Sequence, residues 1–326
     1  MTPRCLSRLT PLAHEGYSPA ALKRLCDRRK LPHHLLFSRS DIPKIRADQS
    51  ARLSISGVQD KLSLRLFRGR LEPVTTGGQF ILKPIPSTTL PKFHSDVPAN
   101  EHLTMQLAEQ VFGIRTAANG LVRLLDDELA YLTRRFDRTL AGDRFAQEDF
   151  CQLMNRSPDT HGPLYKYDSS YEALGATLTR YCAAYAVEVE ELFLRLVFSY
   201  ATCNGDGHLK NFSLRQGPRG DYLLTPAYDL LSSTLHLPTE PRLALELFDE
   251  GEVPDGVAKE GFETGRDFLE LAKRFGMRPH RALAVVQRLA RQRAMVVSLI
   301  GRSFLTEAAK RTYLRNYDDR LRALSM

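Results

Sequence analysis

Asp206 and Asn211 lie five positions apart in the stretch CNGDGHLKNFSL, residues 203–214, directly after a strongly apolar segment. This D-x-x-x-x-N spacing occurs in the catalytic loops of kinases. Phosphoryl transfer needs a carboxylate that receives the proton of the attacking hydroxyl, and a nearby carboxamide oxygen that holds magnesium on the phosphates. Asp206 suits the first role and Asn211 the second. Asn and Asp also form ordinary turns, so the spacing is informative only together with its surroundings.

The elements expected around this loop favour the catalytic interpretation. A helix is expected over residues 189–203, and two strands, 212–216 and 221–230, follow the loop and are joined by the turn GPRG. Asp229, near the end of the second strand, stands where kinases place the aspartate of their D-F-G motif. Asp229 is therefore expected to be a further ligand of magnesium, an acidic one.

The chain before residue 120 predicts a small antiparallel sheet and one helix. The helix covers residues 98–114, with Asn100 as its N-cap and Gly113 as its stop. Apolar residues recur along it at intervals of four, so one face is expected to pack on the sheet. The expected strands are residues 52–57, 61–69 and 79–84.

Three features of this region could contact a nucleotide. Lys83 ends the third strand like the kinase lysine that contacts phosphates, although a lysine that closes an edge strand is the ordinary alternative. Glu101 can either orient Lys83 or act as a first-turn acid on the helix dipole, and the sequence does not decide between these roles. The turn SISGVQDK is the candidate phosphate-covering turn, and the strand period places Ser54 and Ser56 on one face. A simple polar face is the alternative.

The remaining elements divide the chain into two parts. Two strands are expected within residues 121–136, and residues 133–146 read as a connector. Helical patterns dominate from Gln147 onward. We therefore expect an α+β, two-lobed, protein-kinase-like fold with a small β-rich lobe over residues 1–138 and a larger, mostly helical lobe over residues 139–326. The expected helices are residues 147–154, 171–185, 189–203, 266–275, 279–300 and 306–324.

Composition limits the class of protein. Apolar residues make up 43% of the 326 residues and charged residues 26%, as in ordinary globular proteins. The five cysteines are scattered without a C-x-x-C pair, which favours reduced thiols over disulfides or a zinc site. No signal peptide or membrane span is evident, so a cytoplasmic protein without a membrane partner is expected. The net charge of +8 admits an acidic partner, but basic residues are spread from residues 22–30 to residues 288–295.

Seven motifs taken in order resemble the HipA family of bacterial serine/threonine kinase toxins. They are SISGVQDK, FILKP, VPANEHLTMQLAEQVFG, YLTRRFDR, QEDFCQL, NGDGHLKNFSL and PAYDLLS, and the resemblance runs from about Leu53 to the C-terminus. It implies a kinase-like fold that uses ATP and magnesium. Asp206 is then the catalytic base, and His208 matches the histidine that follows this aspartate in the family.

The resemblance implies roles for the other candidate residues as well. Asn211 and Asp229 are implied to bind magnesium, and Lys83, with Glu101 beside it, to contact ATP. Ser56, Gly57 and Val58 belong to the phosphate-covering turn, where Ser54 and Ser56 match the position of autophosphorylation. Arg134 and Phe136 match the segment whose backbone meets the adenine.

The resemblance also implies a function and partners. Family members phosphorylate an aminoacyl-tRNA synthetase and so inhibit translation, and a helix-turn-helix antitoxin of the HipB type restrains them and joins them to DNA indirectly. The chain is most similar to the short HipT toxins of three-component systems, for which a separate HipS-like protein and tryptophanyl-tRNA synthetase are implied, with glutamyl-tRNA synthetase as the other substrate. A small-molecule phosphotransferase of the aminoglycoside or choline kinase type is the alternative enzyme. A catalytically inactive co-repressor bound to DNA is the third interpretation.

Overall fold

The computed structural model describes residues 3–50, 60–217 and 219–326. The chain forms two compact units, which we call the β-rich unit and the helical unit. The β-rich unit comprises Met1–Gln106, Ala117–Arg144 and Ser298–Lys310. The helical unit comprises Leu107–Thr116, Phe145–Val297 and Arg311–Met326. Each unit therefore contains segments that are distant in sequence.

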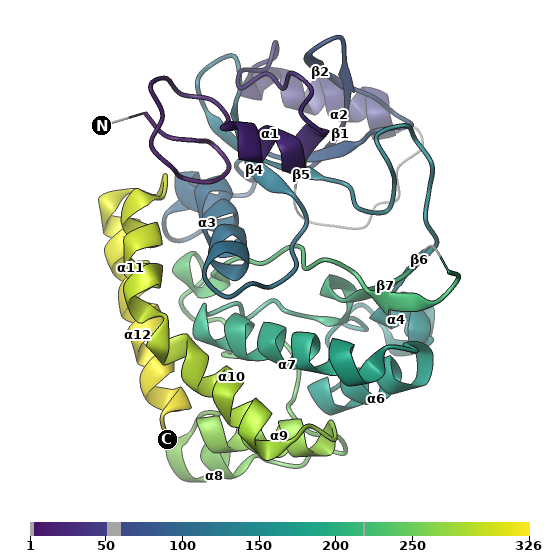
Figure 1. The fold of residues 1–326 in the computed structure, drawn as a ribbon, viewed down its shortest axis with the longest axis vertical. Coiled ribbons are helices and arrows are strands. Elements are labelled where there is room, and N and C mark those ends of the chain that lie inside the picture. Colours follow the sequence, from purple (N-terminus) through teal and green to yellow (C-terminus); the bar gives the residue numbers. More distant parts are fainter. Residues whose placement is uncertain (1–2, 51–59, 218) are drawn as a thin grey trace. The chain divides into compact units, whose positions relative to one another are not determined.

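A five-stranded antiparallel sheet forms the centre of the β-rich unit (Figure 1). Its strand order is β2-β1-β3-β5-β4. The expected sheet is therefore present, but the segment between β1 and β3 adds an edge strand that the sequence did not predict. The expected strand over residues 52–57 lies outside the described residues. The strands are β1 (Leu62–Phe67), β2 (Arg70–Pro73), β3 (Phe80–Lys83), β4 (Asn119–Arg123) and β5 (Leu129–Arg134).

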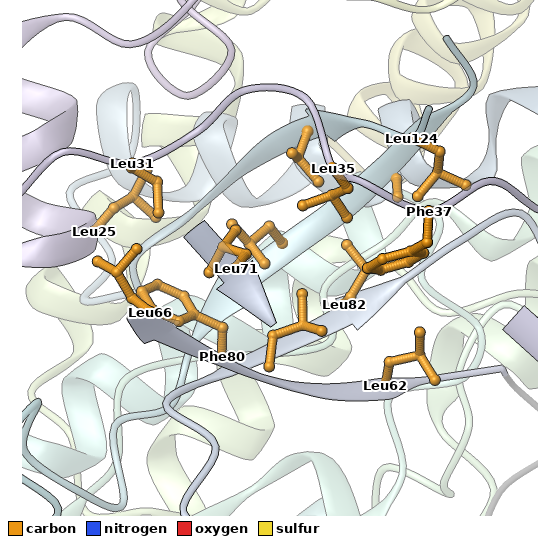
Figure 2. Packing of buried hydrophobic residues seen from close by; sticks show 14 of the residues in the cluster. Leu25, Leu31, Leu35, Phe37, Leu62, Leu66, Leu71, Phe80, Leu82 and Leu124 are labelled. Atoms are coloured by element: carbon orange, nitrogen blue, oxygen red, sulfur yellow. The ribbon is translucent and has the colours of Figure 1, made fainter. Parts of the chain in front are cut away.

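The core of this unit lies on one face of the sheet. Alternate residues of β1 point inward, so Leu62, Leu64 and Leu66 are buried while the residues between them are more exposed. Figure 2 shows Leu62 and Leu66 packed with Phe80 and Leu82 and with apolar residues of the N-terminal segment, and Leu64 belongs to the same cluster. The N-terminal residues are therefore an integral part of the core rather than a separate appendage.

Two short helices in the N-terminal segment were missed by the sequence analysis, which predicted one helix before residue 120. Helix α1 (Pro19–Cys26) begins with proline at its first position, and the Ser18 side chain caps it. Helix α2 (Ile42–Ser50) follows. Helices of eight and nine residues are too short to show a clear 3.6-residue repeat.

Helix α3 (Val97–Gln110) differs from its prediction in two respects. It begins at Val97, so Asn100 lies inside the helix and is not its N-cap. Almost every side chain is buried, including the polar residues Asn100, Glu101 and Gln106. A helix buried on all sides needs partners for its polar groups, and Gln106 Nε2 accordingly donates to Asn119 Oδ1 at 2.9 Å.

The helical unit contains most of the helices and a three-stranded antiparallel sheet of order β6-β7-β8 (Figure 1). Among the described residues, no helix combines the length and apolar composition that would let it cross a membrane. The strands are β6 (Gln147–Asp149), β7 (Ser213–Gln216) and β8 (Tyr222–Leu224). The helices are α4 (Phe150–Leu153), α5 (Pro158–His161), α6 (Tyr171–Tyr181), α7 (Tyr185–Ala201), α8 (Asp255–Glu260), α9 (Gly265–Arg274) and α10 (Pro279–Arg291). Helices α11 (Arg293–Arg302) and α12 (Glu307–Leu324) each cross from one unit to the other.

Two predicted helices were partly wrong. Residues 147–149 form β6 because they pair with β7, and only the residues after Asp149 are helical. The predicted helix over residues 279–300 is interrupted at Gln292, which ends α10 before α11 begins. In the first case, pairing with a distant strand overrides a local helical pattern.

His102 of α3 provides a test of how this helix is buried. Its Nε2 donates to the carbonyl of Ser7 at 2.8 Å, and burial lowers the pKa of His102 to about 4. The unfolded chain takes up this proton near pH 6.5. The free energy of unfolding should therefore fall as the pH drops from about 6.5 to 4, by up to about 3 kcal/mol from this residue alone.

The variant His102→Gln keeps an uncharged donor and should lose this part of the pH dependence. Urea titrations of both proteins between pH 7 and 4 measure it, since all other titrating groups are common to the pair. Parallel stability profiles for the two proteins would contradict the assignment.

Candidate active site

The β-rich unit contains a buried ion pair between a strand end and α3. Lys83 is the last residue of β3, and its Nζ lies 2.7 Å from Glu101 Oε1. The two side chains are only 8% and 3% exposed. The lysine also lies over the ring of Tyr131, the residue opposite it on β5. Two roles were considered for Glu101, orientation of Lys83 or interaction with the helix dipole. The structure contains the contact with Lys83 that the first role requires.

Arg134 and Phe136 lie at and just after the end of β5. The guanidinium of Arg134 donates to both carboxylate oxygens of Asp27, at 2.8 and 3.2 Å. The Arg134 side chain is thus occupied within its own unit. A contact of this segment with adenine stays a prediction that concerns its backbone.

The candidate phosphate-covering turn lies mostly outside the described residues, including Ser54, Ser56, Gly57 and Val58. Asp60, at its end, is described and is buried. Its carboxylate accepts hydrogen bonds from the Ser87 amide at 2.9 Å and from Arg46. This anchor fixes the point where the turn joins β1, and the sequence analysis did not identify it.

The loop that contains Asp206 follows α7, and three hydrogen bonds from other segments hold its backbone. Gly205 donates its amide to Ser233 Oγ at 2.8 Å, and the Tyr171 hydroxyl donates to the Gly207 carbonyl at 3.0 Å. The Leu209 amide donates to the Lys166 carbonyl at 3.2 Å. The loop is therefore held on both sides of the aspartate.

The Asp206 side chain accepts a hydrogen bond through one of its two carboxylate oxygens. The Tyr167 hydroxyl donates to Asp206 Oδ1 at 2.5 Å, while the Asp206 side chain stays 43% exposed. Burial and this hydrogen bond to a carboxylate raise the pKa of Tyr167. A protonated phenol is the form that can donate, so the contact orients a carboxylate that solvent can still reach.

His208 contacts a second residue of the same segment. Lys166 Nζ lies 2.9 Å from His208 Nε2. An ammonium can only donate, so Nε2 is the acceptor and the ring proton belongs on Nδ1. Burial lowers the pKa of His208, and the Lys166 charge adds to this effect while Asp206 opposes it. A catalytic role of His208 stays a prediction, since this contact already occupies the lone pair of its ring.

Asn211 has a fixed carboxamide. Its Oδ1 accepts the backbone N–H of His208 at 3.0 Å, which also determines which atom of the amide is the oxygen. Asp229 adopts a left-handed backbone with φ of 56° and is exposed. The neighbouring Tyr228 hydroxyl donates to the Lys210 carbonyl at 2.8 Å, which ties the Asp229 segment to the loop beside Asn211.

Two further carboxylates shape the loop and were missed by the sequence analysis. Asp149 caps α4 with one oxygen and pairs with Lys210 Nζ at 3.2 Å through the other. Glu240 lies against Gly205, and burial raises its pKa, with Asp206 adding to the effect. Glu240 therefore takes up a proton at a higher pH than an ordinary glutamate does.

The structure brings the predicted residues together in two groups. Asp206, His208, Asn211 and Asp229 belong to the helical unit, and Lys83 and Glu101 to the β-rich unit. Lys166 and Tyr167 were missed, because 39 residues separate Tyr167 from the aspartate that it contacts. The only local signal was the cluster of aromatic and basic residues in LYKYD, residues 164–168.

Comparison with known proteins identifies the family. A model of the HipA-like C-terminal domain matches residues 53–297, and the chain therefore belongs to this family. A Haemophilus influenzae protein named "Putative kinase" is 28% identical over 342 residues, which cover 99% of this chain and 97% of that protein. "Putative kinase Y4dM" of Sinorhizobium fredii is 35% identical over 211 residues, or 60% of this chain. The chain matches 48% of the length of that larger protein.

Solved structures are similar in fold. The Shewanella oneidensis toxin HipA, solved with HipB and its operator DNA, matches with a TM-score of 0.60 and 23% identity over 83% of this chain and 63% of HipA. The Helicobacter pylori proinflammatory kinase CtkA matches with a TM-score of 0.55 and 13% identity over 81% of this chain and 90% of CtkA. The predicted α+β, kinase-like fold class is thus confirmed.

Asn211 offers a test of the loop that needs no assay of activity. In Asn211→Leu, the amide of His208 loses its side-chain acceptor and keeps only its bond to the Asp206 carbonyl, which should lower the free energy of unfolding by about 0.5–1.5 kcal/mol. The variant Asn211→Asp keeps an oxygen acceptor at the same place and should lose much less. Chemical denaturation of the three proteins measures the difference. Equal losses in the two variants would show that the hydrogen bond contributes nothing.

Proposed function

We propose that this chain is an ATP-dependent serine/threonine protein kinase and the toxin of a type II toxin–antitoxin system. One observation carries the proposal, namely the buried ion pair of Lys83 and Glu101. Such pairs rarely add stability because both charges lose their hydration, so its presence is best explained by a ligand that needs the lysine. Membership of the HipA-like family and the fixed Asn211 carboxamide support the same activity.

Asp206 is the proposed general base. It accepts the proton of a substrate serine hydroxyl while the serine oxygen attacks the γ-phosphorus and the bond to the β–γ bridging oxygen breaks. In the described contacts Tyr167 engages Oδ1, so Oδ2 can receive the proton. Tyr167 thereby keeps an exposed carboxylate in one orientation. Lys83 contacts the nucleotide phosphates, and Glu101 orients it.

Asn211 and Asp229 are the proposed ligands of Mg²⁺, which when bound neutralises the charge of the phosphate oxygens. Their donor set fits this ion, because both offer hard oxygen atoms and Asn211 Oδ1 retains one lone pair beyond its bond to His208. Within the described residues, no three His, Cys, Asp or Glu side chains gather into a metal site. Mg²⁺ commonly needs only one or two protein ligands besides phosphates and water.

The nucleotide contacts and the partners extend this proposal. Ser56, Gly57 and Val58 cover the phosphates, and the backbone at Arg134 and Phe136 meets the adenine. The acceptor is a serine of tryptophanyl- or glutamyl-tRNA synthetase. The partners are a helix-turn-helix antitoxin, as in the Shewanella HipA complex with HipB and DNA, and a separate HipS-like protein. Autophosphorylation at Ser54 or Ser56 adds about −1.5 to −2 charge where phosphates bind and so switches the kinase off.

Substitution of Asp206 tests the chemistry. Asp206→Asn removes the base while it keeps the shape of the side chain, and phosphate transfer should slow by about 10²- to 10⁴-fold. Intact-mass spectrometry after incubation with ATP and Mg²⁺ should show added phosphate, mapped to Ser54 or Ser56, on the wild type only. Lys83→Met should raise the ATP concentration needed for half-maximal transfer.

The matched control is Asp255→Asn, an equivalent change at an exposed carboxylate of α8. It should keep the wild-type rate. Transfer by Asp206→Asn at the wild-type rate would refute the role of the base. A wild type that phosphorylates kanamycin or choline instead of protein would favour the small-molecule phosphotransferase.

A second pair of variants tests the orientation of the base. Tyr167→Phe removes the hydrogen bond to Asp206 and should lower kcat about tenfold or more without a change in the KM for ATP, since hydrogen bonds to charged groups contribute about 1.5–3 kcal/mol. Tyr171→Phe, in α6, removes a hydroxyl that also bonds to this loop, but at the Gly207 carbonyl and not at Asp206. It should lower stability but leave kcat nearly unchanged. Equal effects on kcat would assign Tyr167 a purely structural role.

A further inference from the structure

A cluster of basic residues without ion pairs lies on the surface of the β-rich unit. Three residues follow α1, and three belong to the hairpin of β1 and β2. All six are exposed, and in the described part of the chain none makes an ion pair with a carboxylate. We call this surface the basic patch, and it consists of Arg28, Arg29, Lys30, Arg65, Arg68 and Arg70.

Packing joins the two halves of the basic patch. The Lys30 side chain lies along the hairpin tip, where its Cδ would be 3.5 Å from a Cβ on Gly69. Beneath the surface, Leu25 and Leu31 share a core cluster with Leu66 and lie at the same end of it (Figure 2). The two halves of the patch therefore meet at the hairpin tip, while Arg65, Phe67 and Arg70 point to the face of the hairpin opposite Leu66 and the residues after α1.

Nearby carboxylates offset only part of the charge of the patch. Asp27 is the acidic residue beside Arg28, but both of its oxygens accept hydrogen bonds from Arg134. Glu72 faces Arg65 across the β1–β2 pair and is the one acid in the hairpin. Elsewhere many arginines are paired, such as Arg123 with Glu15 and Arg293 with Asp318. The positive charge of the patch is thus left exposed.

Two arginines of the patch occupy backbone positions that do not favour arginine. Arg28 and Arg68 both adopt the left-handed conformation, with φ of 66° and 49°. Glycine and asparagine adopt it with less strain than arginine. Residues 68 and 69 form the two-residue turn of the hairpin, where Asn-Gly is the favoured sequence. An arginine in such a position is better explained by a ligand than by stability.

Phe67 adds an aromatic face to the patch. Its side chain is 45% exposed, and the guanidinium groups of Arg65 and Arg68 lie 5.4 and 5.2 Å from the centre of its ring. Phe67 is directly opposite Arg70 across the turn, so the hairpin presents both side chains from a rigid base. An aromatic ring among arginines is the arrangement that stacks bases and holds phosphates in single-stranded nucleic acid.

We infer that the basic patch binds single-stranded nucleic acid, with phosphates on the arginines and a base stacked on Phe67. A protein partner fits less well, because protein interfaces have an apolar core that is depleted of charge, whereas Phe67 is the one large apolar residue here. This surface shares no residue with the candidate active site. The inference therefore does not depend on the proposed kinase activity.

Fluorescence anisotropy with labelled rU12 and dT12 oligonucleotides across a salt series tests the inference with the whole chain. The wild type should bind either strand, with an affinity that falls steeply as salt rises. The double variant Arg28→Asn, Arg68→Asn removes two charges and also relieves strain. Its affinity should drop about tenfold or more, and the slope of log K against log salt should become shallower by about 1.4. Its melting temperature should be unchanged or higher.

Two further variants separate charge from stacking. Arg311→Ala with Arg315→Ala removes the same charge from exposed positions of α12 and should bind like the wild type. Phe67→Leu should bind at least about fivefold more weakly with an unchanged salt slope, because stacking is lost but the phosphate contacts remain.

Three results would overturn the inference. The first is a wild type that binds neither oligonucleotide. The second is an equal loss of affinity in the α12 control, which would assign binding to net charge alone. The third is binding of poly-glutamate or of a 12-base-pair duplex as tight as that of the single strands, which would point to an acidic protein or to unspecific phosphate contacts.

Discussion

The buried ion pair of Lys83 and Glu101 is the constraint on which much of the β-rich unit depends. Removal of two charges from water costs several kcal/mol for each ion, and only a short contact of fixed geometry offsets this cost. The strand and the helix must therefore keep their spacing. Polar residues of α3 provide for this, since His102 bonds to the carbonyl of Ser7 and Gln106 to the side chain of Asn119. A helix with an ordinary apolar stripe could slide or rotate, whereas one with directional bonds on several sides cannot.

The sequence was informative where the relevant residues lie close together along the chain. Asp206 and Asn211 could be assigned to one loop because their spacing and the flanking elements are local features. The contact of Lys83 with Glu101 could be proposed but not decided, since it depends on how a strand end meets a helix. Tyr167 and Lys166 could not be found, because only the folded chain brings them to Asp206 and His208. The polar partners of a site are thus harder to predict than its central residues.

The same distinction explains the errors in the fold. The predicted strands β1 and β3 were present because alternating residues are a local pattern. Residues 147–149 appeared helical but form a strand, since pairing with β7 outweighs their own preference. Asn100 appeared to be a helix cap, yet the helix begins three residues earlier and buries it. Local propensity is a weak guide wherever burial on several sides determines the conformation.

The distribution of charge shows why composition alone is a poor guide to partners. Along the sequence the basic residues are spread, and the excess of +8 has no evident centre. In the folded chain, arginines such as Arg115, Arg195 and Arg274 pair with glutamates, which removes them from the exposed excess. The electrostatic field that a ligand meets depends on the basic side chains that are left unpaired, because the charge of a paired side chain is largely cancelled by its partner. Salt screens what remains of the field within about 10 Å. The hairpin of β1 and β2 and the residues after α1 thus account for more of this field than their share of the sequence suggests, and a charge count by residue number cannot reveal it.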